Sequence, residues 1–275
     1  MNKILVSVFP NETAAYQGLS ALRELHGAGD ITLYDADVII KDASGKTALK
    51  ETTSHGPLGT IVGIVGGSLV GVVGGPVGVA VGAYMGGIGG AMYDLFKLGI
   101  SMDFIDEVTT SLRPGTAAVV SDLDESWITP VETKLVPLGA VNIRQTRNQI
   151  DDELLDREAD ELNAELAQLR AEMRETNAAN KAAVQARIDA TTTKLHELDD
   201  RIVKKLADLH ADFDARMATL KAQRQHAQQH AQANIDARMA ELKASYETRK
   251  ARLERAHELS KEASHLRAEA LTPAR

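Results

Sequence analysis

Glycine recurs at every fourth position through a long uncharged segment, and this spacing constrains the fold more than any other feature of the chain. Residues 56–93 contain no charged side chain and hold 14 of the 21 glycines. Their spacing defines a ridge of nine positions: Gly59, Gly63, Gly67, Gly71, Gly75, Gly78, Gly82, Gly86 and Gly90. On a helix, residues four apart share a face, so this ridge lets another backbone approach closely.

The segment predicts a glycine-zipper helical hairpin with helices over 58–73 and 76–93. Pro76 suits the first turn of the second helix. Glycine costs about 1 kcal/mol relative to alanine in a helix, so a free-standing soluble hairpin is not expected. Close packing must compensate, and two dry environments are open. One is a lipid bilayer, which needs about 20 residues per span, and the other is the interior of a soluble protein assembly.

The chain on either side of the hairpin is typical of a mixed α+β domain. Apolar and β-branched runs predict strands over 3–9, 31–40, 46–53, 116–120 and 141–144. Asn11 is expected to cap the first helix, and the glycines at 27 and 29 are expected to end it. A second helix is expected over 104–112, and a third from an Asp124 cap through Trp127, Val131 and Leu135. This order predicts a ferredoxin-like domain over residues 1–147, interrupted at 56–93, with helices on one face of an antiparallel sheet.

Several separated motifs in this half are similar to an uncharacterised bacterial family of predicted membrane proteins. They are an Ala-Leu-x-Glu-Leu helix ending at Leu25, residues 38–46, residues 99–107 and residues 112–117. Together with the glycine-rich hairpin they cover about residues 3–145 in the family's order. The resemblance implies the same fold and association with a membrane, and it implies no known activity.

The second half of the chain is predicted to be one long helix. Residues 140–272 contain neither glycine nor proline, and their apolar positions repeat every eleven residues. Eleven residues in three turns favour a straight or slightly right-handed coiled coil. The expected seam is Leu195, Leu198, Ile202, Leu206, Leu209, Phe213, Met217 and Leu220. If continuous over 150–270, the helix is about 180 Å long, with a bend rather than a stop at 177–180 and at 223–234.

The coiled coil is predicted to span residues 148–272 as a separate domain. An apolar stripe on a single helix cannot bury itself, so partner helices are required. Residues after Gly139 carry nearly balanced charge, 23 basic and 24 acidic, which permits pairing with a second copy. The sequence therefore predicts a homo-oligomer.

Composition narrows the function. The net charge of −8 argues against a nucleic-acid partner, and the lack of cysteine excludes disulfides and thiolate chemistry. No catalytic, cofactor-binding or metal-ligating constellation is predicted, and the protein is not expected to be an enzyme. The pattern predicts a self-assembling scaffold, attached by its hairpin to the cytoplasmic face of the inner membrane and oligomerising through the coiled coil. Two alternatives stay open: a soluble cytoplasmic homo-oligomer with buried hairpins, and, by fold analogy, a small-ligand sensory module.

Overall fold

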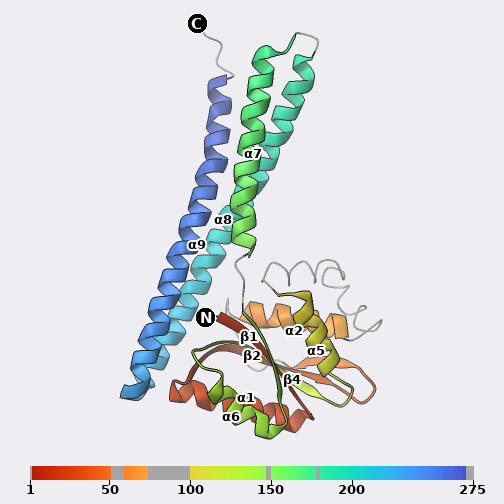
Figure 1. The fold of residues 1–275 in the computed structure, drawn as a ribbon, viewed down its shortest axis with the longest axis vertical. Coiled ribbons are helices and arrows are strands. Elements are labelled where there is room, and N and C mark those ends of the chain that lie inside the picture. Colours follow the sequence, from red (N-terminus) through yellow and green to blue (C-terminus); the bar gives the residue numbers. More distant parts are fainter. Residues whose placement is uncertain (1, 51–58, 74–99, 147–149, 178–179, 271–275) are drawn as a thin grey trace. The chain divides into compact units, whose positions relative to one another are not determined.

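A computed structural model describes residues 2–50, 59–73, 100–146, 150–177 and 180–270 (Figure 1). Contacts divide the chain into two compact units. Unit 1 comprises residues 1–149 and 212–243, and unit 2 comprises residues 150–211 and 244–275. The segment 212–243, which lies within the predicted coiled coil, thus packs with the β-sheet.

Unit 1 is built on a five-stranded antiparallel sheet with the strand order β3-β2-β4-β1-β5. The strands are β1 (Asn2–Phe9), β2 (Ile31–Lys41), β3 (Thr47–Lys50), β4 (Ala117–Glu125) and β5 (Val141–Thr146). The helices of this part are α1 (Glu12–Ala28), α2 (Gly59–Val73), α5 (Met102–Ser111), α6 (Thr129–Leu135) and the short 3₁₀ helix η2 (Val136–Leu138). The α+β class is therefore as predicted.

Local sequence explains the ends of α1. Asn11 accepts a hydrogen bond from the main-chain N–H of Ala14 at 2.9 Å, which caps the first turn. Gly29 ends the helix with φ of +84°, a conformation that glycine adopts without steric cost. Both capping roles were expected from the sequence.

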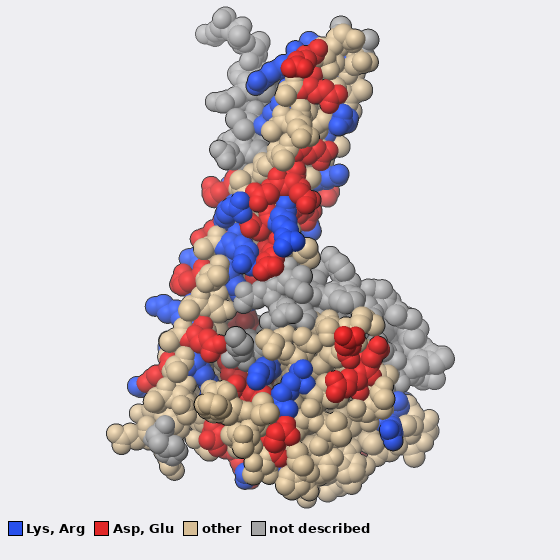
Figure 2. Space-filling view, in the orientation of Figure 1, with Lys and Arg blue, Asp and Glu red and all other residues tan. Residues whose placement is uncertain are grey.

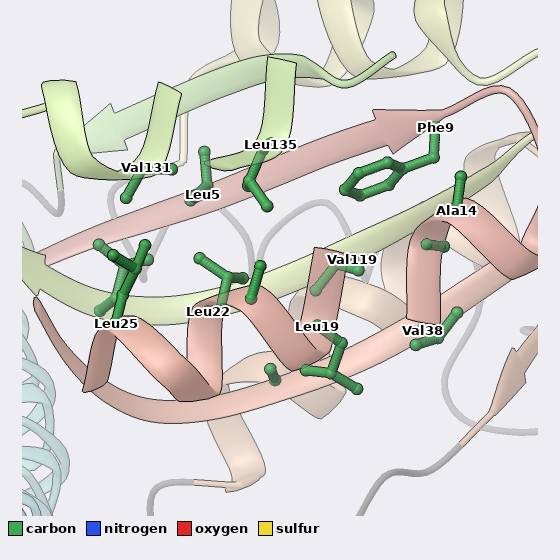
Figure 3. Close-up of a cluster of buried hydrophobic side chains, with 14 of the residues drawn as sticks. Leu5, Phe9, Ala14, Leu19, Leu22, Leu25, Val38, Val119, Val131 and Leu135 are labelled. Carbon is green, nitrogen blue, oxygen red and sulfur yellow. The ribbon is translucent and has the colours of Figure 1, made fainter. Parts of the chain in front are cut away.

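The sheet is covered on both faces, so the prediction of helices on one face was wrong. Helices α1 and α6 cover one face, where Leu19, Leu22 and Leu135 are buried against Leu5 and its neighbours (Figure 3). Helices α2 and α5 cover the other face (Figure 1). The physical reason is that the central strands carry apolar side chains on both faces, and each face requires a cover.

Helix α2 confirms a helix in the first part of the glycine segment. Its side chains Val62, Val65 and Leu69 are fully buried in the core against the sheet. The second predicted helix, 76–93, lies outside the described residues. Among the described helices, none combines the length and apolarity needed to cross a membrane.

Strand β4 is longer than expected, and the predicted cap at Asp124 was wrong. Asp124 lies inside the strand, opposite Asn2 of β1 and Thr32 of β2. Helix α6 begins only at Thr129, and Trp127 is 75% exposed rather than part of the helical core. The acidic residues stay in the sheet because distant side chains pair with them, as described below.

Unit 2 consists of α7 (Ile150–Glu175), residues 181–211 of α8 (Lys181–His226) and residues 244–270 of α9 (Gln229–Ala270). The helices end within or beside the two segments where the predicted seam is weakest, so the expected bends are stops. Leucines from all three helices form one cluster, which includes Leu162, Leu198 and Leu253. The chain thus supplies partner helices to itself, because its interruptions let successive helices pack together.

Candidate functional site

Carboxylates gather on the neighbouring strands β2 and β4, in the middle of β2 and toward the end of β4. Asp35 lies opposite Asp122 across the strand pair, and Asp37, Asp124 and Glu125 are close by in sequence. All five residues are buried. Burial of charged groups is costly unless they are paired and hydrogen-bonded, so this acidic strand end requires cationic partners.

The partner of Asp122 comes from the part of the helical region that belongs to unit 1. We call residues 212–243, the end of α8 and the start of α9, the docked hairpin. Its apolar base is a cluster of Leu220, Ala227, Ala231 and Ile235, against which Tyr34 of β2 packs. The hairpin therefore contributes to the core of unit 1.

Arg216 of α8 is the centre of the site and has no exposed surface. Its Nη2 donates to Oδ2 of Asp122 at 2.6 Å, and its Nε donates to both carboxylate oxygens of Asp212, at 2.9 and 3.0 Å. The guanidinium also lies over the ring of Tyr34, 4.4 Å from its centroid. The Tyr34 hydroxyl donates to Oδ2 of Asp124 at 2.7 Å. One side chain thus joins the hairpin to both central strands.

The neighbouring carboxylates shift the pKa values of both Arg216 and Tyr34. Burial by itself lowers the pKa of Arg216, but the carboxylates of Asp122 and Asp212 more than offset it, and the net shift is upward. Burial and the neighbouring Asp124 carboxylate raise the pKa of the Tyr34 hydroxyl. Both shifts favour a charged Arg216 beside a neutral Tyr34.

Two further hairpin side chains bind main-chain carbonyls at the junction of α1 and β2. Gln223 donates through Nε2 to the carbonyls of His26 at 2.6 Å and Ile31 at 2.7 Å. Arg238 donates to the carbonyls of Gly29 at 3.2 Å and Asp30 at 2.6 Å. The last carbonyls of a helix lack partners within the helix, and a cation there also interacts favourably with the helix dipole. The hairpin thus completes the carboxyl end of α1.

The α1–β2 junction also determines how closely the hairpin can approach. A Cβ atom on Gly29 would lie 2.6 Å from the Cβ of Ala231. Only a glycine on one side and a small side chain on the other fit this contact. The close approach brings Arg238 within reach of the carbonyls that it binds.

A second ionic network lies on strands β1, β4 and β5 and includes α6. Oε1 of Glu125 accepts from Nζ of Lys3 at 3.2 Å and from Nε of Arg144 at 2.8 Å. Arg144 also pairs with Glu132 of α6 at 2.6 Å. Burial lowers the pKa of Arg144, but the Glu125 and Glu132 carboxylates raise it by more, so the net shift is upward. This network secures α6 to the sheet.

Unit 2 contains a serine, a histidine and an aspartate in contact, but not in the geometry of a hydrolytic triad. Nδ1 of His257 lies 2.6 Å from Oδ1 of Asp199, and the hydroxyl of Ser260 donates to that same oxygen. In a nucleophilic triad the histidine stands between the serine and the acid. Here the acid stands between the other two, so the contacts join α8 to α9 and do not activate Ser260.

The residues predicted for the glycine ridge and for the coiled-coil seam lie in different surroundings in the structure. Of the glycine ridge, a Cβ on Gly63 or Gly67 would meet no atom within 4 Å, so these positions face away from the sheet, whereas Gly66 lies against Leu49. The ridge positions from 75 to 90 lie outside the described residues. Of the seam, Leu195, Leu198, Ile202, Leu206 and Leu209 belong to the apolar cluster of unit 2, Leu220 is buried in the docked hairpin, and Phe213 and Met217 are half-buried.

The residues that build the site were not among the predicted ones. Arg216, Gln223 and Arg238 lie between apolar positions of the eleven-residue repeat, where polar side chains on a helix are usually solvated. The signal that could have found them is the acidic end of β4, which needs cations from elsewhere in the chain.

One further feature of the described surface is a shallow depression on unit 1. This open depression of about 450 Å³ lies beside Trp127 and is lined by Leu25 of α1, Asp30 after that helix, and residues of α6 such as Lys134. Within the part of the chain that the structure describes, no group of three or more metal-ligating side chains is placed to hold an ion.

Residues 59–160 match a protein family described as a protein of unknown function (DUF1269). The match runs from α2 through the sheet strands β4 and β5 into α7, and it ends before the docked hairpin. Comparison with curated proteins and with solved structures gave no match. The match supports the resemblance to an uncharacterised family.

Proposed function

We propose that the protein is a non-enzymatic scaffold in which the sheet domain anchors a helical arm formed by residues 150–275. The observation that carries this proposal is the pairing of Arg216 with Asp122, both without exposed side-chain surface. A carboxylate that is enclosed and held by a guanidinium is poorly suited to receive a substrate. It is well suited to specify where a helix docks, because a misplaced helix would leave a buried charge without a partner.

The exposed surface of the arm is the part offered to partners in this proposal. On the face that Figure 2 shows, acidic and basic side chains are interspersed along the helices. Because the apolar seam is used within the chain, we place self-association elsewhere than in the coiled coil. A protein partner that recognises a mixed-charge helical surface fits this arm best.

The anchoring role is tested by hydrogen exchange over residues 212–243 in the full-length protein. The substitution Arg216→Met removes the charge that Asp122 requires, and we expect faster exchange across the hairpin. Arg201→Met is the matched control, because Arg201 lies on the same helix in an exposed pair with Glu158 at 2.6 Å. Equal exchange in the two variants would refute the anchoring role.

We infer that the sheet belongs to the ferredoxin-like group. Strands β2-β4-β1-β5, taken with α1 and α6, have the order and the crossovers of a split βαβ pair. In this proposal β3, α2 and α5 are additions between its second and third strands. The sensory alternative rests on this analogy alone.

We propose that the glycine-rich segment packs against protein, with the ridge of α2 receiving the second ridge of residues 78–90 from the same or another copy. Support comes from Val62, Val65 and Leu69, which α2 directs toward its own sheet, and from the open space at Gly63 and Gly67. Attachment of the same segment to the cytoplasmic face of the inner membrane is the second proposal, favoured by the uncharged run over 56–93.

Two glycine variants and a fractionation separate these proposals. Gly67→Leu fills the open face, and we expect it to change the oligomeric size in sedimentation without unfolding the sheet. Gly66→Leu is the control that disturbs packing inside unit 1, because a Cβ atom on Gly66 would already lie 3.1 Å from a methyl group of Leu49. Recovery of wild-type protein in the carbonate-washed membrane pellet would favour membrane attachment, and an unchanged size for Gly67→Leu would refute ridge packing.

A further inference from the structure

His26 lies where the docked hairpin meets the last turn of α1. Its Nδ1 accepts a hydrogen bond from the main-chain N–H of Leu33 in β2 at 3.2 Å, and its carbonyl accepts from Nε2 of Gln223 at 2.6 Å. Because Nδ1 is an acceptor, the neutral ring carries its proton on Nε2. One residue therefore takes part in both the sheet contact and the hairpin contact.

The charged group that acts on His26 from the hairpin is Arg238 of α9. The neighbours from the other elements, Gln223 of α8 and the main chain of Leu33 in β2, are neutral. Asp30, Asp124 and Tyr34 act on Arg238 itself. Burial, and then the charge of Arg238, lower the pKa of His26 below its ordinary value of 6.5. His26 is therefore neutral at pH 7 in the docked state.

We propose that His26 is a proton-sensitive latch whose protonation loosens the docked hairpin from the sheet. Protonation converts Nδ1 into a donor, so the N–H of Leu33 loses its acceptor and faces another N–H. It also places a positive charge beside Arg238, which already binds the carbonyls of Gly29 and Asp30. The first effect loosens the α1–β2 junction, whose carbonyls Gln223 and Arg238 bind, and the second acts on Arg238 directly. The latch rests on the proposed anchoring function.

The direction of the pH dependence follows from linkage. The pKa of His26 is lower in the docked state than in the released state, so between the two values the released state binds more protons. Docking is at full strength above the ordinary histidine pKa and weakens as the pH falls below it. A single proton can reduce the docked-to-released ratio by at most about tenfold per pH unit.

The test is hydrogen exchange of residues 212–243 in the full-length protein between about pH 7.5 and about pH 5, corrected for intrinsic exchange. We expect protection of the hairpin to fall across this range in the wild type. His26→Asn keeps an acceptor for the N–H of Leu33 but does not titrate, and its protection should not fall. His226→Asn, at an exposed histidine of the same hairpin, should behave as the wild type.

A second measurement keeps the latch testable if His26→Asn does not fold. In wild-type protein, the NMR shift of the Leu33 amide should titrate with the same midpoint as the loss of protection. Protection that does not change with pH, equal loss in His26→Asn, or different midpoints would each overturn the latch. Low protection of residues 212–243 already at pH 7.5 would instead refute the anchoring function.

Discussion

The two parts of α8 and α9 share an apolar helical repeat but differ in the side chains buried beside it. In unit 2 their inward positions are apolar, as at Leu198, Ile202 and Leu253. The docked hairpin keeps an apolar base, with Leu220 and Ile235 buried. It also buries three polar side chains, those of Arg216, Gln223 and Arg238. Apolar packing tolerates small shifts in register, whereas a buried guanidinium must meet its carboxylate. The comparison teaches that apolar packing holds the helices of unit 2 together, whereas the buried polar contacts fix the register of the docked hairpin on its sheet.

The largest expected effect comes from breaking the buried ion pair. Arg216→Met leaves Asp122 buried without its guanidinium, and such a change costs about 3–5 kcal/mol. Urea unfolding followed by the fluorescence of Trp127, the single tryptophan and a residue of unit 1, measures the free energy of unfolding of that unit. Changing Asp122→Leu together with Arg216→Met should recover most of the loss, because apolar replacement of both partners is often close to neutral. A single variant as stable as the wild type would contradict the proposed role of the pair.

The second-largest loss of stability is expected from a cavity in the apolar cluster of unit 2. Leu198 has no exposed surface, and Leu198→Ala should lower the stability of unit 2 by about 2–4 kcal/mol. Circular dichroism during urea unfolding reports on these helices. Val203→Ala is the matched control on the same helix, since Val203 is 48% exposed, and it should change stability by less than about 0.5 kcal/mol. Similar losses in both variants would show that the seam is misplaced.

The close contact at Gly29 gives a smaller expected effect. Gly29→Ala forces a side chain into the left-handed region, at about 1–2 kcal/mol, and onto Ala231. Gly27→Ala should have the opposite effect on stability, because Gly27 lies inside α1 with open space around it. Alanine should stabilise that position by about 0.5–1 kcal/mol. Thermal melts of the two variants should therefore move in opposite directions, and a shared direction would refute the contact.

The smallest effect is expected at an exposed pair on the same hairpin. Arg224 pairs with Asp236 across the α8–α9 turn at 2.5 Å, with about half of each side chain exposed. Exposed pairs are screened by water and salt and contribute little. Arg224→Ala should leave the melting temperature of unit 1 unchanged. A loss comparable to that of Arg216→Met would show that burial is not what distinguishes the two arginines.

Much of the secondary structure follows from local chemistry. The alternation and β-branching of residues 3–9 predict β1, and Asn11 and Gly29 mark the ends of α1. The weak seam around residues 177–180 and 223–234 marks the two helix interruptions. The sequence could not show that these are stops, because a bend and a turn share the same polar, glycine-free composition.

The candidate site was beyond sequence reasoning. Asp122 and Arg216 are 94 residues apart, and each taken alone resembles an ordinary surface charge. Asp124 suited a helix cap, and only its pairing inside the sheet excluded that role. The wrong assignment arose because local propensity favours aspartate at a cap, while tertiary partners reversed the cost of burying it.

By itself the sequence determined the helical and strand periods, the two residues that cap α1 and the places where the long helices are interrupted. These depend on neighbours within one or two turns. Tertiary structure decided that both faces of the sheet are covered, that α7, α8 and α9 pack within one chain, and that the acidic end of β4 is buried. Those outcomes depend on whether a side chain far away in the sequence covers an apolar face or pairs with a buried charge. The local sequence pattern does not show which distant residues will meet.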